Sequence, residues 1–129
     1  MEEFERRLRI ARWRDQELYP SNCIGTALYL VGEIEEDIDI GVHTAYNNYF
    51  RHLNVSLNPQ IGSLIAWQHQ EPRKIVHCAV ITRLEPLEVA HREGCKGTVE
   101  TNQPIESVKR TYRHFKGSLV YYLPRRLTL

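Results

Sequence analysis

The sequence lacks the features of several large classes of protein. Its 129 residues contain no apolar run of about 18 residues, the length that a membrane-spanning helix needs. The 17 Lys and Arg residues nearly balance 16 Asp and Glu residues, and a net charge of +1 gives no electrostatic reason to expect nucleic acid as a partner. The acidic N-terminal segment has no apolar stretch typical of a secretory signal, so we expect a cytoplasmic protein that does not insert into membranes.

Cysteine is scarce and odd in number. The three residues Cys23, Cys78 and Cys95 do not suggest a disulfide framework, and we expect reduced thiols. The length fits a single domain, 1–129, that can bury a core without disulfides. Nothing in the composition indicates a cofactor, and the oligomeric state is left open.

Helical patterns fill the first half of the chain. Segment 2–17 repeats apolar residues at helical spacing. Pro20 interrupts this pattern, and Asn22 is a good N-cap for a second, mostly apolar helix that should run to about residue 36. Residues 42–53 form a shorter helical candidate. We expect the acidic run 33–37 to be a solvated helix end.

Strand patterns dominate the second half. The strongest, 75–83, is apolar and β-branched, and a turn at 84–86 leads into a returning strand. The full set of strand candidates is 61–67, 75–83, 87–92, 98–100 and 119–123, with a short helix within 105–114. Helices followed by strands predict an α+β fold, with N-terminal helices packed on an antiparallel β-sheet.

Cys23 falls in the first turn of the predicted buried helix. The free N–H groups and the dipole at such a position stabilise a thiolate, and the same N–H groups suit an oxyanion. Gly25 would let another chain segment or a substrate approach the helix start closely. Taken alone, a cysteine at this position is more often a packing residue.

Two histidines on the predicted hairpin add to this pattern. If residues 84–86 form the turn, His77 faces Glu93, and His91 is its diagonal neighbour on the same face, at roughly 7–8 Å. A slip of one residue would place the two imidazoles on opposite faces. The pair suits a general base and the residue that orients it. His77 would then take the proton of Cys23, and His91 would fix the tautomer of His77.

Four stretches now occur in a fixed order along the chain: Asn22-Cys23-Ile24-Gly25-Thr26, Gly62-Ser63-Leu64-Ile65-Ala66-Trp67, His77-Cys78-Ala79-Val80-Ile81 and Ala90-His91. In this order and spacing the sequence resembles the NlpC/P60 superfamily of papain-like cysteine peptidases and amidases. Members of that family carry a cysteine at a helix start, a Gly-Asp-Leu-Val-Phe-Trp strand, a His-Val-Gly-Ile-Tyr strand and a third polar residue. The resemblance covers roughly residues 18–125.

The resemblance implies a papain-like NlpC/P60 fold with Cys23 as nucleophile, His77 as general base and His91 as the third polar residue. It also places Tyr19 close to the active site. Trp67, a large aromatic in a predicted strand, is expected in the core or in the wall of the cleft, and Tyr19 and Trp67 are the candidate substrate-binding residues. The resemblance further implies a hydrolase that cleaves an amide or isopeptide bond in a small peptide through an acyl-enzyme. The family's usual substrate is the stem peptide of peptidoglycan.

Three positions depart from the family pattern. Asn22, Ile24 and Ser63 stand where Asp, Ser and Asp are common, and these departures weaken the expectation of a cell-wall peptide. A non-catalytic binding domain on the same fold therefore remains an alternative. A zinc site built from the three catalytic candidates is a further alternative, although no metal-binding spacing supports it.

Overall fold

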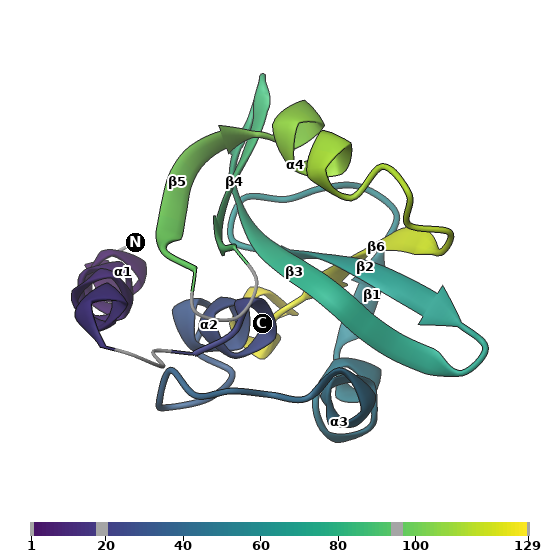
Figure 1. Cartoon of the computed structure of the whole chain (residues 1–129), viewed down its shortest axis with the longest axis horizontal. Coiled ribbons are helices and arrows are strands. Elements are labelled where there is room, and N and C mark those ends of the chain that lie inside the picture. The colour runs from purple at the N-terminus through teal and green to yellow at the C-terminus, as the bar shows by residue number, and fades with distance from the viewer. Residues whose placement is uncertain (1, 18–20, 94–96, 129) are drawn as a thin grey trace.

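The computed structural model describes residues 2–17, 21–93 and 97–128, and it shows an α+β fold with one six-stranded antiparallel sheet (Figure 1). The predicted fold class is confirmed at this level. Tyr19 and Cys95 lie outside the described residues. The helices are α1 (Glu2–Trp13), α2 (Cys23–Leu30), α3 (Val42–Asn48) and α4 (Ile105–Thr111), with 3-10 turns η1 (Arg14–Gln16), η2 (Phe50–His52) and η3 (Arg125–Thr128).

The sheet has the strand order β1-β6-β2-β3-β4-β5, and every neighbouring pair is antiparallel. The strands are β1 (Asn54–Ser56), β2 (Leu64–Gln70), β3 (Arg73–Leu84), β4 (Leu87–Arg92), β5 (Val99–Pro104) and β6 (Ser118–Leu123). The short edge strand β1 was not predicted, because three mostly exposed residues carry no periodic signal.

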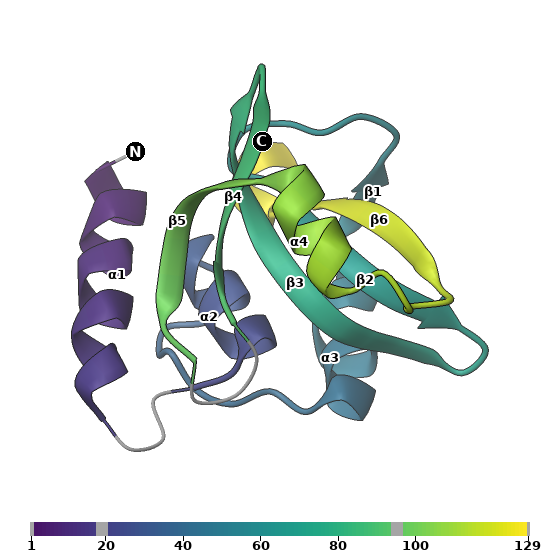
Figure 2. The ribbon, with the colours of Figure 1, turned by 45° about the horizontal axis from the view of Figure 1, so that its top comes forward.

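Helices cover both faces of the sheet (Figure 2). Helices α2 and α3 pack on one face, here called the α2 face, where Cys78 and Val80 of β3 join their apolar cluster. Helix α4 packs on the opposite α4 face, against Ala79 and Ile81 of the same strand. Because successive side chains of a strand point to opposite faces, this one apolar run contributes to two separate cores. No helix in the described part of the chain has the length and apolar character needed to cross a membrane.

Helix α2 begins where the sequence predicts and ends earlier. The side chain of Asn22 caps it by accepting the N–H of Gly25 at 2.8 Å. The helix stops at Leu30 because Gly32 adopts a left-handed conformation with φ of 82°. The N–H of Glu33 then bonds to the carbonyl of Leu28, which closes a Schellman motif. The prediction of a helix to about residue 36 is therefore wrong.

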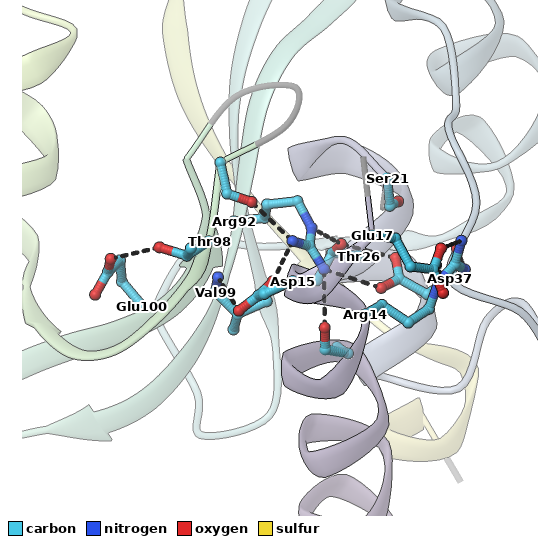
Figure 3. Close-up of polar contacts among 12 residues, drawn as sticks. Arg14, Asp15, Glu17, Ser21, Thr26, Asp37, Arg92, Thr98, Val99 and Glu100 are labelled. Carbon is cyan, nitrogen blue, oxygen red and sulfur yellow. Dashed lines mark hydrogen bonds and ion pairs between the residues drawn. The ribbon is translucent and has the colours of Figure 1, made fainter. Parts of the chain in front are cut away.

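The acidic run 33–37 is not helical, and only its middle, Glu35 and Glu36, is solvated as expected. The Glu33 side chain is 4% exposed and pairs with Arg125, while Asp37 is buried and pairs with Arg92. Figure 3 shows the Arg92 guanidinium at the centre of this second group, where it also reaches Asp15 and Thr26. Buried carboxylates need such partners, since an unpaired charge in the interior is strongly unfavourable.

The β3–β4 hairpin reaches the predicted register by a different route. Its turn is only Glu85 and Pro86, so Leu84 pairs with Leu87 rather than Arg83 with Leu87. A register shift between Ile81 and Arg83 then corrects the pairing to Val80–Ala90. Beyond the irregularity, on the side away from the turn, the two strands pair as a three-residue turn would have made them pair. This register puts His91 and His77 on one face of the sheet.

Candidate active site

Cys23 is the first residue of α2 and is buried in the cluster on the α2 face. Its thiol donates a hydrogen bond to the carbonyl oxygen of Val76, with Sγ and oxygen 3.9 Å apart. Val76 is the residue before His77 on β3. The predicted nucleophile therefore lies at the start of a buried helix and against the strand that carries the predicted base.

The start of α2 is held by a crossing segment of the chain. The amide of Asn22 donates to the carbonyl of Ile40 at 2.7 Å, and its oxygen accepts the N–H of the same residue at 3.2 Å. A Cβ on Gly25 would lie 1.6 Å from the carbonyl oxygen of Ile38. The close approach that Gly25 permits is therefore made by the chain itself. The Asn22 side chain thus both donates to and accepts from Ile40, which an ionised aspartate at this position could not do.

The two histidines meet, as predicted. Nε2 of His77 lies 2.8 Å from Nδ1 of His91, and the two rings are nearly perpendicular. Both imidazoles are buried, at 0% and 4% exposure. His91 is therefore not a solvent-facing strand residue.

Burial decides the charge of this pair. It lowers the pKa of His77 to about 3, and the neighbouring His91 adds to the shift. Burial also lowers the pKa of His91, an effect that Glu93 and Glu100 oppose. Both rings are therefore neutral at pH 7, and a neutral imidazole is the form that can accept a proton.

Tyr112, which the sequence did not single out, completes the group. Its hydroxyl lies 2.9 Å from Nδ1 of His77, and its ring stacks on the imidazole with centroids 4.4 Å apart. Burial raises the pKa of Tyr112 to about 12, and the charge of Cys23 adds to the increase. Tyr112 follows α4 directly, so packing of that short helix delivers the hydroxyl to the α4 face. No motif pointed to this tyrosine, because the contact spans 35 residues of sequence.

Trp67 lies in the core beside the same imidazole. It is 2% exposed, and its ring stands edge-on to His77 at 5.1 Å between centroids. Of the two placements expected for Trp67, core and cleft wall, the structure supports the core. The second predicted substrate residue, Tyr19, falls outside the described residues.

Cys23 and His77 pack in different clusters, although the charge of Cys23 still raises the pKa of Tyr112 beside His77. Cys23 belongs to the cluster on the α2 face, whereas His77 stacks with Trp67 and Tyr112 on the α4 face. Both ring nitrogens of His77 have described partners, Tyr112 at Nδ1 and His91 at Nε2. The structure therefore joins the two histidines directly, and the thiol contacts β3, the strand of His77, at the neighbouring peptide group.

No family model, curated protein or solved structure matches this chain. The relationship to the NlpC/P60 superfamily consequently stays a prediction that rests on the four motifs and their order.

Two further departures from the family pattern have structural explanations. Ile24 is fully buried in the core on the α2 face, and Ser63 is buried with its hydroxyl donating to the carbonyl of Gln60 at 2.6 Å. Among the residues that the structure describes, no group of three or more His, Cys, Asp or Glu side chains is arranged to hold a metal ion. The zinc alternative therefore has no support from the geometry.

Proposed function

We propose that this protein is a cysteine hydrolase that cleaves an amide or isopeptide bond in a small peptide, with an NlpC/P60-like papain fold. Cys23 is its nucleophile, His77 its general base and His91 the residue that orients the base. The observation that carries the proposal is the 2.8 Å contact of His91 with His77, whose strand the Cys23 thiol touches at Val76. A structural role alone does not require two buried, neutral imidazoles beside a thiol at a helix start.

In the proposed reaction the sulfur of Cys23 attacks the substrate carbonyl carbon while its proton passes to Nδ1 of His77. A C–S bond forms, and the tetrahedral oxyanion is stabilised by N–H groups of the first turn of α2. His77 then returns the proton to the departing amine, and the C–N bond breaks to leave an acyl-enzyme. Water attacks this thioester, gives its proton back through His77 and releases the acid and the thiol.

Tyr112 controls the base in this scheme. Since its pKa is about 12, the hydroxyl is protonated and donates to Nδ1 of His77. His77 then carries its proton on Nε2 and donates it to Nδ1 of His91. This tautomer leaves a lone pair on Nδ1, the atom that must receive the thiol proton. The hydroxyl has to release that nitrogen before catalysis, so the described state is a resting state.

A non-catalytic binding domain is the second candidate. It is favoured by the engagement of both His77 nitrogens and by the low pKa of His77, about 3, because these features make the imidazole a weak base. The two candidates differ in one measurable property, the reactivity of the Cys23 thiol.

The test is alkylation of the native protein with iodoacetamide between pH 5 and 9, with adducts located by mass spectrometry. Cys78 serves as the internal control, since burial raises the pKa of that thiol and it should stay unreactive. The proposal expects Cys23 to react well below pH 8.5, the ordinary pKa of a thiol, and to lose this advantage in His77→Ala. An inert Cys23, or one that reacts as an ordinary thiol without dependence on His77, would establish the binding domain instead.

A further inference from the structure

A cavity lies on the α2 face, and neither histidine of the pair lines it. It has a volume of about 240 Å³ and is lined from α3, η2 and strands β1, β2, β3 and β6. The residues that determine its chemistry are Tyr46, Phe50, Arg51, Gln68, Arg73 and Tyr122. We call this cavity the arginine cavity. The lining contains two arginines and no aspartate or glutamate.

The floor of the arginine cavity carries a fixed hydrogen-bond donor. Tyr122 donates its hydroxyl to Oε1 of Gln68 at 2.5 Å, and Gln68 is only 3% exposed. Burial raises the pKa of Tyr122 to about 12, so its hydroxyl remains a donor and fixes the orientation of the amide. No buried side-chain nitrogen or oxygen in the described residues lacks a partner. Within the described part of the chain the Gln68 amide nitrogen has no hydrogen bond, so it must be accessible, and Gln68 lines the cavity.

The two arginines supply positive charge at the rim. Arg73 donates to the hydroxyl of Tyr46 and lies over its ring at 5.2 Å, so its guanidinium is held in place. Neither Arg73 nor Arg51 forms an ion pair with a described carboxylate. By contrast, Arg7, Arg14 and Arg92 all have carboxylate partners. The charge of the cavity is thus uncompensated by this part of the protein.

The remaining wall is apolar, with Phe50 and the Tyr122 ring packed edge to face at 5.0 Å beside Val120. We propose that the arginine cavity binds a small carboxylate with an apolar body, its carboxylate held by Arg51, Arg73 and the Gln68 amide. Planar guanidinium and amide donors suit a planar carboxylate, and the apolar wall provides burial for the rest of the ligand. This inference does not depend on the proposed hydrolase activity.

The experiment is a titration of the native protein with N-acetyl-leucine, followed by NMR through the side-chain amide of Gln68 and the guanidinium Nε–H of Arg73. We expect saturable shifts of both signals. Arg73→Gln and Arg51→Gln should each weaken binding about tenfold, because a charge-assisted hydrogen bond is lost. Arg83→Gln, a change of an exposed arginine outside the cavity, is the matched control and should leave the affinity unchanged. Cys23→Ala should also bind normally.

Three comparison ligands make the test decisive. N-acetyl-leucinamide lacks the charge, acetate lacks the apolar body, and inorganic phosphate is a different anion. Weaker binding of all three than of N-acetyl-leucine supports the proposal. Equal binding of the amide would overturn the role of the arginines, equal binding of phosphate or acetate would reduce the cavity to a general anion site, and absence of saturable shifts with N-acetyl-leucine would reject the site.

Discussion

The hydroxyl of Tyr112 lies 2.9 Å from Nδ1 of His77, the nitrogen that a catalytic thiol would need. The same ring stacks on the imidazole and extends the pair of histidines into a line of three side chains. A base that is present but occupied is consistent with an enzyme held at rest, and it makes the behaviour of Tyr112 the most informative property of the site.

Tyr112→Phe should increase the rate of Cys23 alkylation at pH 7 several-fold. The change keeps the stacked ring and removes only the hydroxyl, so Nδ1 of His77 becomes available to the thiol. Second-order rates with iodoacetamide measure the effect. Tyr121→Phe, a change of a half-buried tyrosine on the same face, should leave the rate unaltered. A slower rate in Tyr112→Phe would show instead that the hydroxyl helps to carry the proton.

The two histidines should differ in their effect on Cys23. His77→Ala removes the base and should reduce the alkylation rate to that of an ordinary thiol. His91→Ala removes only the partner of Nε2, so it should cause a smaller loss, and its effect on any hydrolase activity should be smaller than that of Cys23→Ala. If His91→Ala matches the parent protein in both measurements, His91 has no part in the site.

Stability should fall as the pH falls from 6.5 to 3. The pKa of His77 is about 3 in the folded protein and near 6.5 when unfolded, so the unfolded chain binds the extra proton throughout this window. The stability contribution is complete above pH 6.5, and its loss by pH 3 amounts to on the order of 4 kcal/mol.

Urea unfolding at pH 7 and pH 4 measures this effect. Other groups titrate in the same range, so the relevant quantity is the difference between the parent and His77→Phe, which should show a flatter dependence on pH. His43→Gln, at an exposed position, should retain the slope of the parent. An unchanged slope in His77→Phe would mean that His77 is protonated at its ordinary pKa in the folded protein.

Arg92→Met should destabilise the fold by about 3–5 kcal/mol, because it leaves the buried carboxylate of Asp37 without its charge partner. The guanidinium also bonds Asp15 at 2.5 Å and two backbone carbonyls (Figure 3). Arg83→Met is the control, since Arg83 makes an exposed ion pair at 4.0 Å and its loss should cost less than about 1 kcal/mol. Chemical denaturation of both variants gives the comparison, and similar losses would contradict the assigned role of Arg92.

The sequence predicted the α+β class, the start of α2 and the meeting of His77 and His91, because these depend on capping residues and on the two-residue period of strands. It failed where partners are far apart along the chain. Asp37 looked like part of a solvated acidic run, and only Arg92, 55 residues later, makes its burial possible. Tyr112 was missed for the same reason. Gly32 could have indicated the early end of α2, but the apolar residues around it were read as a continuing helix.

The irregularity in β3 has a consequence for the whole molecule. Trp67 pairs with His77, but the next residue, Gln68, pairs with Ile75, so Val76 is an extra residue in the strand. This extra residue determines which face of the sheet each of residues 73–75 points to. If Val76 paired with Gln68 in a regular ladder, residues 73–75 would turn to the other side of the sheet, and Arg73 would leave Tyr46 while the histidines kept their places. One residue thus determines whether the histidine pair and the arginine cavity can exist in the same protein.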